Sequence, residues 1–203
     1  MEQPARRTQF SQNSVEGGGI ERCARAFAEL AHEVGPRAVT PEMVAGRVDM
    51  PRAAFFGLFP RSEEAVGSAC EVARDVLLEP VEAAAESPGR WEERLEATIG
   101  ALLETVREEP YLAGLCFVHA PFLLDASGPY DRAFMETFAG ILQEILPKAK
   151  GYPLPRYSEL AASGIVAIIA RRLSGGEADL LGDLRGELTA VISIPYLRAE
   201  AEG

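Results

Sequence analysis

Residues 40–64 read TPEMVAGRVDMPRAAFFGLFPRSEE, and this stretch predicts two short helices separated by a tight turn. The first helix is expected over 41–48, because Thr40 is a good N-cap residue and proline is favoured at the first helical position. The second is expected over 51–58, because Asp49-Met50-Pro51 marks a turn and a new start. Two helices of about two turns each, joined by two or three residues, form a helix-turn-helix.

A longer helix is expected before this motif. Three consecutive glycines, residues 17–19, predict a break ahead of it, so residues 1–19 are expected to form a flexible arm. Gly35-Pro36 predicts its end, since glycine favours the position after a helix and proline cannot continue one. The apolar residues of this helix recur at spacings of four, three, four and three, which places them on one face: Ile20, Ala24, Phe27, Ala31 and Val34.

The rest of the chain also follows helical periodicity, and no segment shows the sustained alternation of a strand. The expected fold class is all-α with about nine helices. A three-helix domain that contains the helix-turn-helix is expected over 20–62, and a larger helical domain over 63–203. The further helices are expected over about 62–86 with a kink at Pro80, 90–109, from 110, 130–146, 156–173 and 177–201.

Composition places the chain among ordinary globular proteins. Its 203 residues are 47% hydrophobic and 25% charged. No stretch approaches the roughly 20 apolar residues that cross a bilayer, and the N-terminus lacks the apolar core of a secretion signal, so a cytoplasmic protein without membrane association is expected. The three cysteines have no metal-ligand spacing and are expected to be core residues, with no metal or cofactor: Cys23, Cys70 and Cys116.

The net charge of −11 opposes binding to nucleic acid, because phosphate contacts need clustered lysine and arginine. The charge is unevenly distributed, however. Residues 1–62 hold eight arginines and seven acidic residues, a net charge of +1, so the other 141 residues carry −12. The two parts of the chain are therefore expected to face different partners.

The sequence holds no recognisable catalytic motif. A nucleophile elbow, an HExxH helix, a P-loop and a glycine-rich dinucleotide loop in the required context are all missing. Adjacent acidic residues such as Glu63 and Glu64 point in different directions on a helix and fit a solvated face. An enzyme is therefore not expected.

From Ile20 to Val66 the chain resembles the DNA-binding domain of the TetR family of transcriptional regulators. The family pattern is an apolar-faced helix ending at a glycine, a threonine that opens the next helix, a short turn, a recognition helix, and then Phe-Pro-Ser-Lys-Glu-Glu. The matching segments are Val34-Gly35, Thr40–Ala45 and Pro51–Glu64, in the family's order and without an insertion. The resemblance implies a dimeric, ligand-responsive repressor that binds a palindromic operator in double-stranded DNA. It also implies that residues 20–62 are the DNA-binding domain and residues 63–203 the ligand-binding and dimerisation domain.

The resemblance places the second helix of the motif in the major groove and its partner helix against the phosphate backbone. Arg52, at the start of the recognition helix, is expected to reach guanine or a phosphate. Thr40 is expected to offer its hydroxyl to a phosphate. The residues expected to contact DNA are Arg37, Thr40, Arg47, Arg52, Ala53, Phe56 and Arg61.

The recognition helix departs from the family pattern at positions that aid phosphate contact. Family members commonly carry hydroxyls at the positions of Ala54 and Phe56 and a basic residue at the position of Ser62. No lysine precedes Lys148. An alternative therefore stays open: a dimeric small-molecule-binding protein whose N-terminal domain binds DNA weakly or not at all.

Large apolar side chains gather in the middle of the chain, where the resemblance implies a pocket for a small, largely apolar ligand. Packing into a closed core is the alternative for any one of these side chains. The residues expected to line the pocket are Trp91, Tyr111, Phe117, His119, Phe122, Phe134 and Phe138.

The last two helices are expected to form a homodimer interface. In the last helix, four apolar residues repeat at spacings of three, four and three, which makes a narrow seam suited to a facing helix. Two helices from each protomer would form a four-helix interface, with packing inside one chain as the alternative. The residues expected at the interface are Ile165, Ile169, Leu181, Leu184, Leu188 and Val191.

Overall fold

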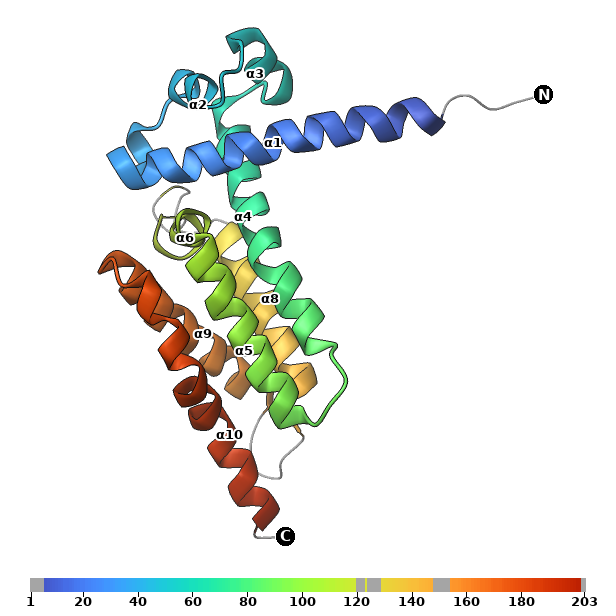
Figure 1. Ribbon diagram of the computed structural model, residues 1–203, viewed down its shortest axis with the longest axis vertical. Coiled ribbons are helices and arrows are strands. Elements are labelled where there is room, and N and C mark those ends of the chain that lie inside the picture. The colour runs from blue at the N-terminus through green and yellow to red at the C-terminus, as the bar shows by residue number, and fades with distance from the viewer. Residues whose placement is uncertain (1–5, 120–122, 124–128, 148–153, 202–203) are drawn as a thin grey trace, which may run out of the picture. The chain divides into compact units, whose positions relative to one another are not determined.

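The chain is helical throughout the part that the structure describes. This computed structural model describes residues 6–119, 123, 129–147 and 154–201. Over these residues the chain forms nine α-helices, joined in places by 3-10 or π-helical turns, and no strand (Figure 1). The all-α prediction is therefore confirmed.

The chain divides into two compact units, Met1–Ala73 and Arg74–Gly203, which we call the head and the body. The division falls inside the long helix α4, Ser62–Ala85, and not at the expected residue 62. The head contains α1 Arg6–Val34, the 3-10 turn η1 Pro36–Ala38, α2 Pro41–Arg47, α3 Arg52–Leu58 and the first part of α4.

The first helix is longer than expected. A break at residues 17–19 was the wrong prediction, because α1 runs without interruption from Arg6 to Val34. Each glycine weakens a helix by about 1 kcal/mol relative to alanine but does not forbid it. Gly19 also has a packing role: a β-carbon at this position would lie only 3.2 Å from Cδ1 of Leu58, so its absence lets α1 and α3 approach closely.

The core of the head forms against the expected face of α1. Its middle residues are buried, whereas Val34, at the helix end, is 48% exposed. The ring of Phe55 lies 5.1 Å from that of Phe59, centre to centre. The buried apolar side chains of the head include Cys23, Ala24, Phe27, Ala28, Ala31, Val44, Ala45, Phe55 and Phe59.

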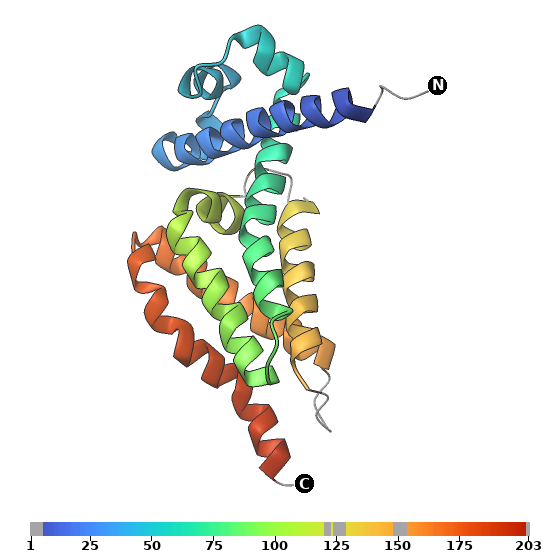
Figure 2. The same cartoon turned by 45° about the vertical axis from the view of Figure 1, so that its right-hand side comes forward.

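The body begins in the second part of α4 and is a bundle of helices. Helix α8 packs against α9, and α10 lies along α5 (Figure 2). The apolar face of α5 is fully buried, because five of its aliphatic residues are at most 1% exposed. The elements are α5 Trp91–Glu108, α6 Pro110–Gly114, the π-helical turn η2 Leu115–His119, α8 Pro129–Ile145, α9 Leu154–Ser174, the 3-10 turns η3 Ala178–Leu180 and η4 Gly182–Leu184, and α10 Arg185–Ala201.

The last helix is shorter than expected. A single helix over 177–201 was predicted, but two 3-10 turns occupy its first part and α10 begins at Arg185. Gly182 and Asp183 have low helix propensity, which explains why the second turn is not part of the α-helix. No helix in the described part of the chain is long and apolar enough to cross a membrane.

Candidate DNA-contacting face and body sites

Helices α2 and α3 form the expected helix-turn-helix (Figure 1). The predicted cap is confirmed, since the backbone N–H of Met43 donates to Oγ1 of Thr40 at 3.3 Å. The turn between the helices begins with Asp49, whose φ of 52° lies in the left-handed region. The N–H of Asp49 donates to the carbonyl of Gly46 and that of Met50 to the carbonyl of Ala45, the pattern of a Schellman motif.

Helix α3 presents one face to the core and one to solvent. Pro51 caps the helix and is not its first residue, which corrects the expected start by one position. Phe55 is 1% exposed and anchors the helix in the head. Phe56 is half-buried with its ring edge-on to that of Phe55, at 5.6 Å between centres. The exposed positions of α3 are Arg52, Ala53, Ala54 and Gly57.

Arg52 is ion-paired across the helix-turn-helix. Its Nη2 lies 3.1 Å from Oε1 of Glu42 in α2, and its guanidinium carbon lies 5.4 Å from the centre of the Phe56 ring. The two charged side chains remain 72% and 52% exposed. The pair therefore sits on the solvent face of the motif, where a ligand can reach it.

Arg47 faces α1. Its guanidinium donates to Oε2 of Glu29 at 2.9 Å and to both carboxylate oxygens of Glu33 at 3.0 and 2.7 Å. These bonds raise the pKa of Arg47 and lower that of Glu33. The structure therefore assigns Arg47 to holding α2 on α1, and a DNA contact would require it to leave these partners.

The remaining expected DNA contacts are exposed. Arg61, beyond α3, pairs with Glu64 at 2.8 Å, and its side chain is 70% exposed. Arg37 and Thr40 are exposed at the two ends of the segment that leads into α2. Of the seven expected residues, the structure brings Arg52, Ala53 and Phe56 together on α3.

The expected ligand residues of the body mostly fill its core. Phe117, Phe134 and Phe138 are at most 8% exposed and form a row. The first two rings meet edge to face and the last two are tilted, with ring centres 4.8 and 5.9 Å apart. Trp91 lies elsewhere, edge-on to Tyr196 of the last helix at 5.9 Å. These four residues therefore do not surround one pocket in this structure, because aromatic packing occupies their apolar surface. That they contact a ligand stays a prediction.

The other expected ligand residues lie at the surface or outside the described part. Tyr111 is 46% exposed on α6, and His119 is half-buried at the end of the π-helical turn η2. Phe122 lies outside the described residues. The turn η2 remains a candidate site, since π-helical turns often occur where a protein binds or reacts.

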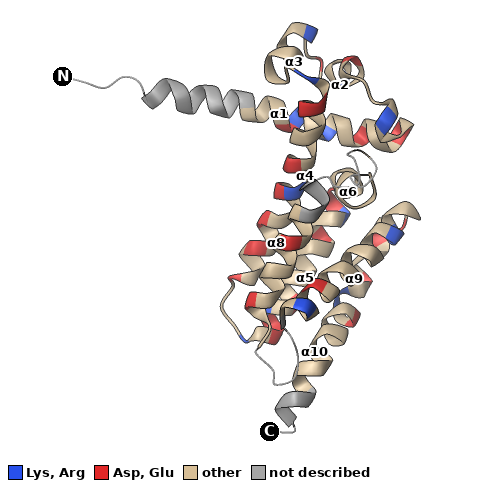
Figure 3. Cartoon of the chain, turned by 180° about the vertical axis from the view of Figure 1, so that it is seen from behind, with Lys and Arg blue, Asp and Glu red and all other residues tan. Residues whose placement is uncertain are grey.

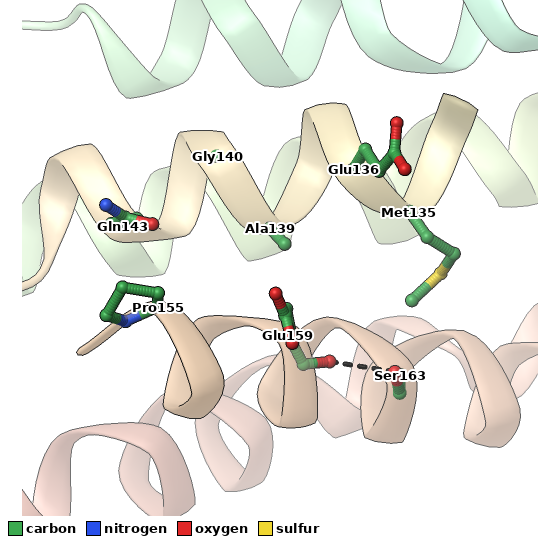
Figure 4. Close-up of a pocket in the computed structure, with 8 residues that line it drawn as sticks. All are labelled: Met135, Glu136, Ala139, Gly140, Gln143, Pro155, Glu159 and Ser163. Atoms are coloured by element: carbon green, nitrogen blue, oxygen red, sulfur yellow. Dashed lines mark hydrogen bonds between the residues drawn. The ribbon is translucent and has the colours of Figure 1, made fainter. Parts of the chain in front are cut away.

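A hollow of about 490 Å³ lies between α8 and α9, away from the expected pocket (Figure 4). Two small residues of α8, Ala139 and Gly140, are among those that line it. Glu159 points across it toward α8 (Figure 4). Its lining is partly polar, which suits a largely apolar ligand poorly: Met135, Glu136, Ala139, Gly140, Gln143, Pro155, Glu159 and Ser163.

The expected dimer residues divide into two groups. Ile165, Ile169, Leu181 and Leu188 are at most 8% exposed inside the body, so they form its own core and not a surface for a partner. Leu184 is half-buried. Leu184 belongs to a 3-10 turn and Leu181 lies just before that turn, so the spacing of an α-helix does not hold at this end of the expected seam.

A different set of apolar residues is exposed on the last two helices. Val191, Ile194 and Leu197 of α10 are 65%, 45% and 46% exposed, and Leu160 of α9 is 73% exposed. The three on α10 share one face because they recur every third residue. Residues 188–197 hold no charged side chain, and the ribbon of α10 is mostly tan there (Figure 3). Of the expected dimer residues, Val191 is in this set.

The described residues contain neither a cluster that could bind a metal ion nor an exposed cysteine. No group of three histidine, cysteine or acidic side chains lies close enough to bind a metal ion there. All three cysteines are buried, as expected. Burial raises the pKa of Cys70 to about 11, which keeps this thiol protonated at neutral pH.

Solved structures match this chain along most of its length. A TetR-like transcriptional regulator from Rhodococcus sp. RHA1 matches with a TM-score of 0.68 at 12% identity, over 83% of this chain and 92% of the other. A putative TetR family regulator from Shewanella sp. PV-4 matches at 0.65 and 13%, over 85% and 95%. The TetR family regulator PfmR from Thermus thermophilus matches at 0.64 and 15%, over 83% and 94%.

The chain has a TetR-like fold. The expected resemblance is thereby confirmed at the level of the fold. No family model and no curated protein matches the sequence itself.

Within this TetR-like fold, three groups of residues were not foreseen. Glu42 lies in the first turn of α2, and its pairing with Arg52 depends on the turn between the helices. Glu29 and Glu33 lie one helical turn apart on α1, which is a local signal for a shared partner, but nothing local identifies Arg47 as that partner. The exposed set on α10 carries a readable signal, since residues 188–197 form a charge-free segment ending in Pro195, Tyr196 and Leu197.

Proposed function

We propose that the protein is a TetR-type DNA-binding transcriptional regulator that acts as a homodimer and responds to a small molecule. The observation that carries this proposal is the helix-turn-helix of the head, with a capped α2, a Schellman turn and an exposed α3, in a chain with a TetR-like fold. A short helix with an exposed outer face fits the major groove, which is about 12 Å wide.

The exposed apolar set of α10, with Leu160 of α9, supports the homodimer. Monomeric proteins seldom leave several large aliphatic side chains exposed on one helix face, and such faces mark interaction sites. Tyr157 joins the two helices, since its hydroxyl donates to the carbonyl of Ile192 at 3.0 Å. Two helices from each protomer would then form the interface, and a two-fold axis would present two recognition helices to a palindromic operator.

The π-helical turn η2 supports a ligand response. Phe117 and His119 both belong to it, and Phe117 packs on the aromatic row of α8. A largely apolar ligand would enter by separating these rings, so the ligand-bound and ligand-free bodies would differ in packing. A repressor of this kind releases its operator when the ligand binds the non-DNA-binding state more tightly.

A second candidate function is supported by the ion pairs of the head. Arg47, Arg52 and Arg61, all expected to contact DNA, each pair with a carboxylate of the same unit. Such pairing lowers the positive charge available to phosphates. This observation favours a dimeric small-molecule-binding protein whose head has lost DNA binding.

One experiment separates the two candidates. A fluorescent duplex carrying the palindrome nearest the gene is titrated with the full chain at low and rising salt. The regulator is expected to bind at low salt and to lose affinity steeply as salt rises, because phosphate contacts release counterions. Arg52→Ala is expected to weaken binding without changing the helical circular dichroism spectrum, whereas Arg22→Ala on the exposed side of α1 is the matched control. No binding at low salt would favour the second candidate.

A further inference from the structure

The recognition helix α3 carries a single side chain that forms hydrogen bonds. Its seven residues, all of which the structure describes, read RAAFFGL. Ala53, Ala54 and Gly57 are exposed but offer no side-chain donor or acceptor, and Phe55 is buried. Hydrogen bonds from side chains of this helix to base edges therefore have to come from Arg52.

Arg52 is held from two sides. Glu42 lies 3.1 Å away on α2, and the ring of Phe56 lies under the guanidinium at 5.4 Å. A planar guanidinium stacks on an aromatic ring and pairs with a carboxylate in defined orientations, so the two contacts restrict its rotamers. Because both charged groups stay exposed, the restricted pair is open to a ligand.

We propose that Arg52 and Glu42 together read a guanine–cytosine base pair, and that Glu42 determines this specificity. In the major groove guanine presents two acceptors, O6 and N7, which two N–H groups of a guanidinium can meet. Cytosine presents its N4 amino group as a donor, which a carboxylate accepts. The guanidinium of Arg52 would thus donate to guanine, while the neighbouring carboxylate of Glu42 accepts from the paired cytosine. The inference rests on the proposed regulator and adds the base pair that it reads.

Glu42 also disfavours the other use of Arg52, which is a contact to phosphate. Its carboxylate neutralises the guanidinium charge and repels a phosphate that lies within the screening length of about 10 Å at 0.1 M salt. Base edges carry no net charge, so this repulsion acts mainly on sequence-independent binding. Removing the carboxylate is therefore expected to raise general affinity for DNA and to lower discrimination between sequences.

The test is enrichment from a pool of DNA duplexes with a randomised centre, using the full chain. The wild-type protein is expected to enrich half-sites with one invariant guanine–cytosine pair. Glu42→Gln is expected to reduce the preference for that pair by about tenfold or more, while its affinity for unselected duplexes rises. Arg52→Lys, which loses the two-pronged donor geometry, is expected to lose the same preference.

Glu63→Gln is the matched control, because it removes the same charge from an exposed position in the first turn of α4. It is expected to leave the preference unchanged. An unchanged preference in Glu42→Gln, or an enriched site with no invariant guanine–cytosine pair, overturns this inference and leaves the regulator standing. Enrichment of no duplex by the wild-type protein at low salt overturns the proposed function as well. Circular dichroism spectra of all variants establish that each one is folded.

Discussion

Arg47 donates two parallel hydrogen bonds to Glu33, Nη1 to Oε1 at 3.0 Å and Nη2 to Oε2 at 2.7 Å. The contact joins the last turn of α2 to α1 across 14 residues of sequence, and Glu29 adds a third bond. A guanidinium held in this way fixes the angle of α2 on its supporting helix, because both donors of the fork have defined acceptors.

The pH dependence of the head's stability follows from this contact. Hydrogen bonds from Arg47 hold the pKa of Glu33 below its ordinary value, so the unfolded chain takes up this proton first as the pH falls. The stability that the Arg47–Glu33 contact gives the head is thus fully present above the ordinary glutamate pKa of about 4.3. It is lost as the pH falls through the lowered pKa of Glu33. Arg47→Met is expected to make the free energy of unfolding less dependent on pH over this acidic range. Urea denaturation at several pH values measures it. The control is Arg22→Met, and equal slopes for the two variants would contradict the assignment.

The turn of the helix-turn-helix predicts a second effect. Asp49 adopts a φ of 52°, which a β-branched residue tolerates poorly. Asp49→Val is expected to lower the free energy of unfolding by about 1–2 kcal/mol. Asp49→Asn, which removes the same charge but tolerates the left-handed region, is expected to change it little. Thermal or urea denaturation of the two variants gives the comparison, and equal losses would point to the charge and not to the backbone.

The three glycines of α1 form a graded series. Gly17 and Gly18 have open space around them, so each change to alanine is expected to stabilise the head by about 1 kcal/mol through helix propensity. Gly19→Ala is expected to stabilise the head by less than this, or to destabilise it, because the new methyl group would lie 3.2 Å from Leu58. Urea denaturation measures all three. A gain at Gly19 equal to the other two would contradict the close approach of α1 and α3.

The proposed dimer predicts the effect of charge on α10. Ile194→Asp is expected to raise the dimer dissociation constant by about 100-fold or more, because the substitution places a charge in both halves of the interface. Ala83→Asp, at an exposed position of α4, is the control and is expected to leave the dimer intact. Sedimentation velocity over a range of concentrations provides the measurement. A dimer of unchanged strength in Ile194→Asp would place the interface on another surface.

Gly100 and Arg185 are expected to be energetically coupled. A β-carbon on Gly100 would overlap the guanidinium of Arg185, so alanine there has to displace the guanidinium from α5. In the wild-type background, Gly100→Ala is expected to raise the free energy of unfolding by less than the roughly 1 kcal/mol that alanine usually adds over glycine in a helix interior. In an Arg185→Ala background the full gain is expected. A double-mutant cycle by urea denaturation measures the difference, and additive effects would refute the contact.

Local signals explain why so much of the fold can be predicted. Thr40, Ser62 and Pro110 mark helix starts that the structure places at or next to the expected residues. Caps and turns depend on hydrogen bonds within a few residues, which the sequence displays directly. The all-α class and the helix-turn-helix rest on signals of this kind.

The sites are less predictable because their contacts join distant segments. Arg47 and Arg52 were both expected to face DNA, yet their carboxylate partners lie 10 to 18 residues away on another helix. Trp91 meets Tyr196 from the opposite end of the body's sequence. Composition shows that such groups exist, but packing alone decides which of them meet.

The outer face of α3 has a consequence for how the proposed regulator could change its DNA target. Ala53, Ala54 and Gly57 are exposed, and nothing lies within 4 Å of a methyl group added to Gly57. A polar side chain introduced at any of these positions would add a new hydrogen-bonding group while leaving the core of the head intact, since surface substitutions usually change stability by less than about 0.5 kcal/mol. In the proposed regulator, one codon change would then be enough to redirect binding to a different operator, which would make this helix a ready scaffold for evolving or engineering new regulatory circuits.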